Sequence, residues 1–166
     1  MNAMVRNPER RWWQGPIVAV VAVLAAPFVL VALVSRALLW LCLHLVIWLC
    51  WNTRGRDVLF VYSDSPVWHA YIEQRFLPHL GRRAVVLNWS ERSRWDISLG
   101  TLAFRFFGGR REFNPLAVVF RPFRWTRTFR FWAAFRDLKH GRPELLQTVE
   151  RRFFDCIGVP RISPSG

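Results

Sequence analysis

The chain has 166 residues, of which 24 are Lys or Arg and 11 are Asp or Glu, so its formal net charge is +13. It is also 52% hydrophobic, which excludes a disordered basic tail, because disorder needs low hydrophobicity together with high net charge. The length excludes two ordinary domains of roughly 100–200 residues each. The three cysteines, Cys42, Cys50 and Cys156, cannot form a paired disulfide framework.

A nearly uncharged apolar stretch runs from Gly15 to Trp51, with Arg36 as its one charged residue. A bilayer is crossed by about 20 apolar residues, so this stretch predicts a membrane segment. Two geometries remain open. One is one long helix, which crosses once and continues along the membrane surface. The other is a pair of crossings or a re-entrant hairpin, bent at Ser35-Arg36 or near Pro27, where proline would remove one helical hydrogen bond.

Arginines flank both ends of the apolar stretch, which favours a cytoplasmic location for both ends and therefore, slightly, the hairpin. They are Arg6, Arg10, Arg11, Arg54 and Arg56. We therefore expect an inner-membrane protein with a cytoplasmic domain. The predicted division is a basic flank (1–14), a membrane segment (15–52), a small α/β domain (53–158) and a flexible tail (159–166). In the membrane segment, His44 is expected to make a polar helix contact, while acylation of Cys42 or Cys50 stays open.

The remaining chain alternates strand and helix patterns. Short apolar, β-branched runs predict three strands, at Asp57–Tyr62, Arg83–Trp89 and Pro115–Phe120. Helical periodicity and capping signals predict helices at 66–80, Ile97–Phe107, Phe129–His140 and Pro143–Ile157. The order β-α-β-α-β-α-α predicts a parallel sheet covered by helices. The carboxyl ends of all three strands would then meet at one ligand-binding edge.

Polar residues follow each predicted strand. Ser63, Ser65 and Arg121 are candidates for binding a phosphate group, since hydroxyls, helix-start amides and guanidinium groups all donate hydrogen bonds to anions. Asp64 and Glu91 are the candidate catalytic acid and base, with His69 nearby. The first loop lacks the glycines of a nucleotide cradle. No metal-ligand spacing occurs, and no cofactor is expected.

The segment Phe104–Arg136 is basic and aromatic at once, with eight arginines, eleven aromatic residues and one acid, Glu112. Its arginines at 121, 124, 127 and 130 recur every three residues, which forms no stripe on a helix and favours a loop leading into an interfacial helix. Such a mixture suits a lipid headgroup region. The residues expected to contact membrane or anions are Arg121, Arg124, Trp125, Arg127, Arg130 and Trp132.

Three functions remain open. The favoured one is a non-catalytic binding or scaffolding component of a membrane assembly, with anionic lipids and a protein partner or a second copy of the chain as its contacts. The second is a membrane-bound enzyme that acts on a lipid-linked or nucleotide substrate at the strand ends. The third, binding of nucleic acid by the same arginines, is disfavoured because the chain is already tethered to a bilayer. An aromatic core with ordinary surface arginines would also explain the Phe104–Arg136 composition.

Overall fold

The computed structural model describes residues 14–109, 114–122 and 124–159. The chain divides into two compact units, Met1–Cys42 and Leu43–Gly166. Apart from Gln14 and Val159, the predicted basic flank and the predicted tail lie outside the described residues.

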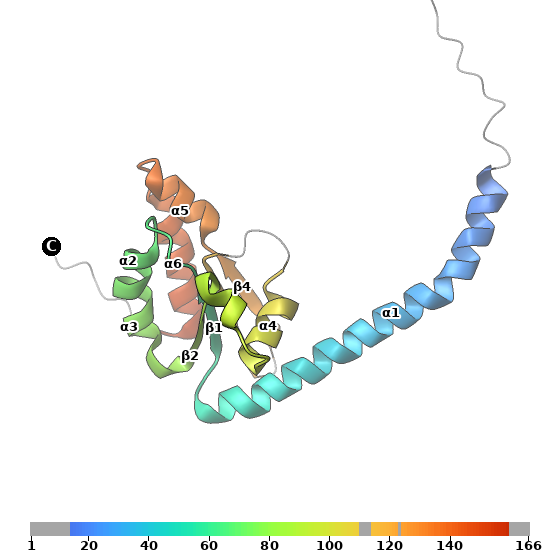
Figure 1. The fold of residues 1–166 in the computed structure, drawn as a ribbon, viewed down its shortest axis with the longest axis horizontal. Helices are drawn as coiled ribbons and strands as arrows, with labels where there is room; N and C mark the ends of the chain where they lie inside the picture. The colour runs from blue at the N-terminus through green and yellow to red at the C-terminus, as the bar shows by residue number, and fades with distance from the viewer. Residues whose placement is uncertain (1–13, 110–113, 123, 160–166) are drawn as a thin grey trace, which may run out of the picture. The chain divides into compact units, whose positions relative to one another are not determined.

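The first unit contains most of helix α1, which runs without interruption from Gln14 to Trp51. At 1.5 Å per residue a helix of this length measures about 57 Å, roughly twice the 30 Å hydrocarbon core of a bilayer. The helix is long and apolar enough to cross a membrane. Of the two predicted geometries the structure has the single long helix. Pro27 lies inside α1, which bends but does not fold back (Figure 1).

The second unit is built on a four-stranded sheet with the order β2-β1-β3-β4. Strands β1 and β2 are parallel, and their register pairs Val58 with Ala84. Strand β3 runs antiparallel to β1, and β4 runs antiparallel to β3. The strands are β1 (Val58–Tyr62), β2 (Ala84–Asn88), β3 (Leu116–Val119) and β4 (Arg127–Arg130).

The expectation of a parallel sheet is therefore wrong for its second half. Strand β3 is buried along its whole length, and a strand buried on both faces reads as a continuous apolar run whichever way it points. The fourth strand was not predicted. Arg127–Arg130, expected to be a loop and the start of a helix, pairs with β3 as the second strand of a hairpin.

The predicted helices are present with shifted ends. The stretch after β1 contains α2, a π-helical turn and α3 in succession, and Ile72, Phe76 and Leu80 form its buried apolar face. The helical elements of the second unit are η2 (Asn52–Arg54), α2 (His69–Tyr71), η3 (Ile72–Phe76), α3 (Leu77–Leu80), η4 (Gly81–Arg83), η5 (Trp89–Arg94), α4 (Leu99–Phe107), α5 (Trp132–Lys139) and α6 (Glu144–Ile157).

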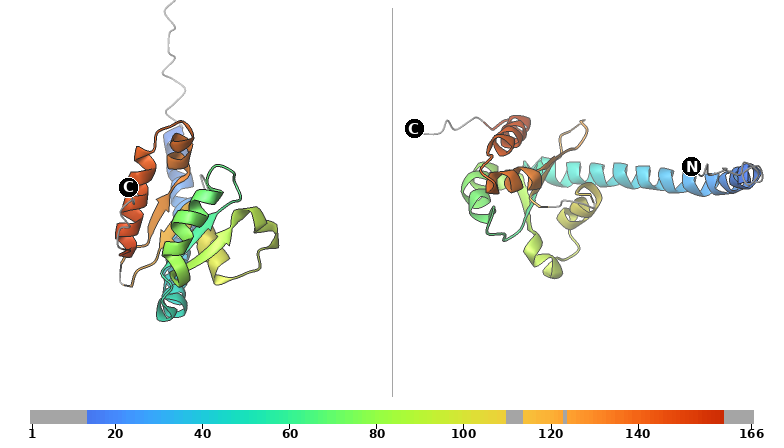
Figure 2. Two further views of the ribbon diagram at one scale, coloured as in Figure 1. Left: turned by 90° about the vertical axis from the view of Figure 1, so that its left-hand side faces the viewer. Right: turned by 90° about the horizontal axis from the view of Figure 1, so that it is seen from above.

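The sheet has a hydrophobic core on each face, and β1 supplies both. Val58, Phe60 and Tyr62 pack with α2, α3, α5 and α6. Leu59 and Val61 point to the opposite face, where they pack with α4 and the end of α1. This alternation follows from the period of two along a strand. Figures 1 and 2 show α4 across the sheet from α5 and α6.

The end of α1 belongs to this domain. Ile47 and Trp51 are 0% and 5% exposed within the second core, and the compact unit begins at Leu43 rather than at the predicted residue 53. Sequence periodicity hides this boundary, because the core-facing residues continue the apolar composition of the membrane segment. Leu45, Val46 and Leu49 in the same turns stay exposed.

Candidate functional site

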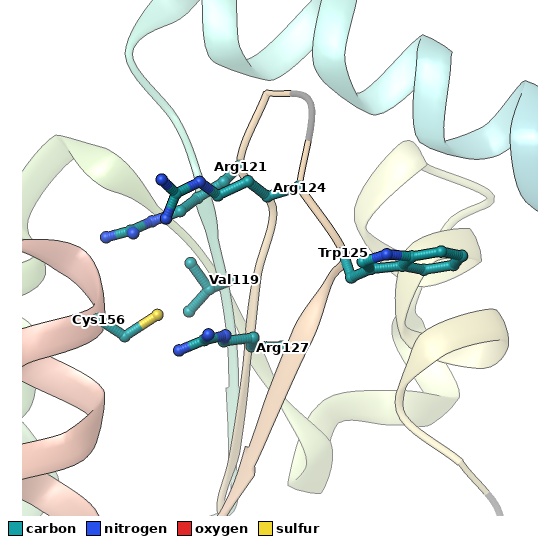
Figure 3. A pocket seen from close by; sticks show the side chains of 6 residues that line it. All are labelled: Val119, Arg121, Arg124, Trp125, Arg127 and Cys156. Carbon is teal, nitrogen blue, oxygen red and sulfur yellow. The ribbon is translucent and has the colours of Figure 1, made fainter.

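A basic pocket lies at the turn end of the β3–β4 hairpin. Its volume is about 230 Å³. The register of the hairpin pairs Val119 with Arg127, so the last residues of β3 and the first of β4 lie side by side. The connecting turn brings in further guanidinium groups, and α6 closes the pocket with a thiol (Figure 3). The lining residues are Val119, Arg121, Arg124, Trp125, Arg127 and Cys156.

The three pocket arginines have no carboxylate partner among the described residues. Other arginines of the domain do have one: Arg83 pairs with Asp57, and Asp137 pairs with both Arg136 and Arg142. Guanidinium groups offer rigid, forked sets of donors that match phosphate and carboxylate oxygens. A pocket that gathers three of them without a neutralising acid is therefore suited to an anion.

The hairpin turn is held against the end of α1. Thr126 Oγ1 lies 3.2 Å from His44 Nδ1, within hydrogen-bonding distance. At the other end of the turn, the Phe120 ring packs edge-on against Trp51, with ring centroids 5.8 Å apart. The predicted polar contact of His44 is thus made with the hairpin rather than with another helix. These contacts join the hairpin turn to His44 and Trp51 of α1, which belong to the same compact unit.

Four of the six residues expected to contact membrane or anions line this pocket. Trp125 is 81% exposed at its rim. The other two lie elsewhere. Arg130 reaches the opposite face of the sheet, where its Nη2 donates to the Gly108 carbonyl at 3.3 Å. Trp132 is the first residue of α5, and the Arg136 guanidinium lies over its ring, 5.0 Å from the centroid.

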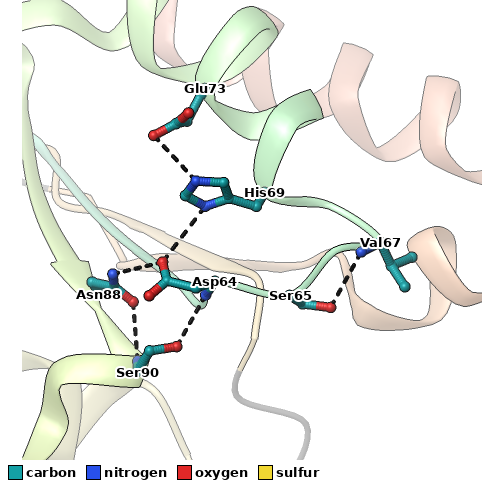
Figure 4. A network of polar contacts seen from close by, with 7 residues as sticks. All are labelled: Asp64, Ser65, Val67, His69, Glu73, Asn88 and Ser90. Carbon is teal, nitrogen blue, oxygen red and sulfur yellow. Dashed lines mark hydrogen bonds and ion pairs between the residues drawn. The ribbon is translucent and has the colours of Figure 1, made fainter.

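The opposite edge of the sheet carries a polar network at the ends of β1 and β2 (Figure 4). Asp64 Oδ1 accepts a hydrogen bond from Asn88 Nδ2 at 2.8 Å, and the Asp64 amide donates to Ser90 Oγ at 3.0 Å. The His69 imidazole lies between two carboxylates, with Nδ1 3.6 Å from Asp64 Oδ1 and Nε2 3.4 Å from Glu73 Oε1. The network ties the loop after β1 to the end of β2.

This edge is acidic. Burial raises the pKa of Tyr62, and the carboxylates of Glu73, Asp64 and Glu91 raise it further. The same negative field opposes a bound phosphate. Ser65, a predicted phosphate ligand, instead accepts a 3.4 Å hydrogen bond from the Val67 amide. Ser63, the other predicted hydroxyl ligand, adjoins Asp64 at the start of this loop.

The antiparallel direction of β3 separates residues that were expected to share a site. Asp64 and Glu91 lie at the carboxyl ends of β1 and β2 as predicted. Arg121, however, follows the end of β3 that pairs with the start of β1, since Val119 is opposite Val58. The expectation that Arg121 binds a phosphate beside Asp64 and Glu91 is therefore wrong. Carboxylates therefore gather at the carboxyl ends of β1 and β2, which form the acidic edge. The pocket arginines gather at the opposite end of these strands, which forms the basic edge.

From the sequence, no site role was assigned to Glu73, Asn88 or Ser90 in the polar network, or to Cys156 in the basic pocket. Cys156 is 7% exposed within the core, and it also lines the pocket. Strand β4 carried no clear signal in the sequence, since Arg127, Thr128 and Arg130 are exposed and only Phe129 is half-buried, so the period of two is not visible over four residues.

Within the described part of the chain, no group of three or more His, Cys, Asp or Glu residues is placed to hold a metal ion. Comparison with protein-family models, with curated proteins and with solved structures yields no match.

Proposed function

We propose that the protein is a membrane-anchored binding protein whose β3–β4 hairpin lies among the headgroups of an anionic leaflet. Arg121, Arg124 and Arg127 bind phosphate groups there, and Trp125 inserts at the interface. The observation that carries this proposal is the placement of the basic pocket on a turn that contacts the end of α1. Tryptophan favours the boundary between water and lipid, and arginine favours lipid phosphates.

Helix α1 supports the anchoring. It is long enough to cross the hydrocarbon even when tilted, and its last turns remain available to pack on the sheet. The exposed Leu45, Val46 and Leu49 would lie where the helix leaves the lipid. Because these turns belong to the folded domain, the hairpin held by Thr126 comes to the level of the headgroups.

The domain is assigned to the cytoplasmic side of an inner membrane. Residues 52–166 carry a net charge of +10, which suits the anionic cytoplasmic leaflet. A single crossing places the N-terminus on the other side, in contrast to the expectation that both ends are cytoplasmic.

Reporter fusions test this topology. A fluorescent protein that folds only in the cytoplasm is attached to the C-terminus, and an enzyme active only outside the cytoplasm is attached to the N-terminus. Both reporters should be active. Loss of fluorescence from the C-terminal fusion, together with activity of the outer-side enzyme when it is attached to the C-terminus instead, would overturn the cytoplasmic role of the domain.

Photocrosslinking tests the headgroup contact in intact membranes. A benzophenone amino acid at position 125 should crosslink to phospholipid, whereas the same group at the exposed position 139, at the far end of α5, should not. Equal lipid labelling at both positions, or none at 125, would refute the placement of the hairpin. Crosslinking of position 125 to RNA or DNA in place of lipid would favour the nucleic-acid alternative.

The proposed role is binding or scaffolding, with a protein partner or a second copy of the chain completing the assembly. Strands β2 and β4 are the outer strands of the sheet over the described residues. An outer strand presents unpaired backbone groups to which another chain can add a strand. Affinity isolation of a tagged chain in mild detergent should recover a defined partner in fixed proportion, and recovery of the monomer alone would argue against a scaffold.

A further inference from the structure

We propose that the basic pocket is a discrete site for one phosphate monoester, and that it does not merely add to a diffuse positive surface. This inference rests on the proposed function, because it names the ligand of the same hairpin. The ligand is either a lipid with a terminal phosphate headgroup or a small soluble phosphomonoester. The two share the chemical group that the pocket recognises.

The charge of the pocket favours a dianion. Arg121, Arg124 and Arg127 place three positive charges around one cavity, with no ion pair to neutralise them among the described residues. Like charges held together repel, and a bound anion relieves that repulsion. A phosphate monoester carries a charge of about −1.5 to −2 at pH 7 and three terminal oxygens. A diester carries a single negative charge and two terminal oxygens, so it satisfies fewer of the guanidinium groups.

The geometry points to a single group. The three arginines come from the residues after β3, from the turn and from the start of β4, and their side chains extend to the same side of the hairpin, where Cys156 of α6 faces them (Figure 3). Val119 and Cys156 form an apolar wall, which places no carboxylate in the cavity to compete with a bound phosphate for the arginines. The Arg124 amide donates to the Arg121 carbonyl at 3.3 Å, which closes the turn and limits how far these two side chains can separate.

The size of the pocket limits the ligand. Its volume of about 230 Å³ lies below the roughly 300–1,000 Å³ of pockets that enclose drug-sized molecules. The cavity therefore suits a phosphate and the first atoms of its ester, with the rest of the molecule outside. A diacylglycerol phosphate meets this condition with its tails in the bilayer, and glycerol 3-phosphate meets it in solution.

Native mass spectrometry of the full chain in mild detergent tests the inference, because it counts bound lipids. The chain is offered phosphatidic acid, phosphatidylglycerol or phosphatidylcholine at equal concentration. We expect one phosphatidic acid per chain, retained about tenfold better than phosphatidylglycerol, since the added negative charge strengthens the charge-assisted hydrogen bonds. Glycerol 3-phosphate is then added as a competitor, with sulfate as a dianion that lacks an ester.

The variant Arg124→Gln/Arg127→Gln should weaken binding on the order of 100-fold, because two charge-assisted contacts are lost. The matched control is Arg151→Gln/Arg152→Gln, which removes the same charge from exposed positions of α6 and should leave binding unchanged. Both pairs are solvent-exposed, and far-ultraviolet circular dichroism verifies that both variants are folded.

The outcomes separate the two proposals. Retention of phosphatidic acid that glycerol 3-phosphate does not displace identifies the lipid, and binding of glycerol 3-phosphate without phosphatidic acid identifies a soluble ligand. Equal retention of phosphatidic acid and phosphatidylglycerol, or equal losses in the two double variants, overturns the discrete site. In that case lipid crosslinking at position 125 can still succeed, and the leaflet contact survives without the pocket.

Discussion

Glu150 is a buried charged residue, and replacing it tests how the helices of the domain pack together. It lies on α6 at 8% exposure. Its Oε2 accepts a 2.7 Å hydrogen bond from the Tyr71 hydroxyl, and its Oε1 accepts a 3.3 Å bond from Arg75 Nε. These contacts join the helix after β1 to the helix that carries Cys156, so they connect the elements that support both edges of the sheet.

The magnitude follows from these contacts. A hydrogen bond to a charged group contributes about 1.5–3 kcal/mol. The bond to Arg75 adds little, because that side chain is 55% exposed and exposed ion pairs contribute about 0–1 kcal/mol. We therefore expect Glu150→Ala to lower the free energy of unfolding by about 2–4 kcal/mol. Glu150→Gln, which keeps an acceptor, should cost about 1 kcal/mol.

The assay is urea unfolding of the full chain in mild detergent, followed by near-ultraviolet circular dichroism of the aromatic core. The control is Glu144→Gln on the exposed first turn of α6, which should cost at most about 1 kcal/mol through the helix dipole. A double-mutant cycle with Tyr71→Phe isolates the hydrogen bond. If the effects of Tyr71→Phe and Glu150→Ala add to within about 0.5 kcal/mol, the bond has no coupling energy and the reasoning is refuted.

Three further outcomes are expected. The pKa of Tyr71 is raised well above 10, first by burial and then by the hydrogen bond to Glu150 and its charge. The unfolded chain therefore loses this proton at lower pH than the folded one, and stability should fall as pH rises above about 10. Tyr71→Phe should flatten that fall, and an unchanged profile would contradict the assignment. A chain that begins at residue 43 should fold in detergent, whereas one that begins at 53 should aggregate because it lacks Trp51 and Ile47; equal proteolytic resistance of the two would refute the boundary. Asp64→Ala should cost about 1 kcal/mol by removing the Asn88 bond at a half-exposed site and should leave phosphatidic acid binding unchanged, whereas lost binding in native mass spectrometry would mean that the two edges of the sheet are coupled.

Several elements were predictable because local patterns specify them. The predicted strand Asp57–Tyr62 is found as β1, and the predicted helix Ile97–Phe107 is found as α4 with a capping box between Ser98 and Thr101. In each case neighbouring residues carry the signal, either as a short β-branched run or as a cap followed by helical periodicity.

The arrangement of the site was less predictable. The gathering of Arg121, Arg124 and Arg127 at one place follows from the β3–β4 register, and the exposed strand β4 resembled a loop in its composition. Cys156 joins them from 29 positions beyond Arg127, through packing of α6 on the sheet. No local pattern encodes a contact at that separation.

The sequence by itself determined the presence of a helix able to cross a membrane, a small α/β domain and a segment both basic and aromatic. Each is a property of composition or of short-range periodicity. Only the tertiary structure decided that β3 runs antiparallel, that the last turns of α1 enter the domain core, and that Arg121 lies at the opposite edge from Asp64. The free energy gained by burying apolar area does not depend on the direction of a strand. An apolar run therefore predicts a strand but does not predict whether it runs parallel or antiparallel to its neighbour.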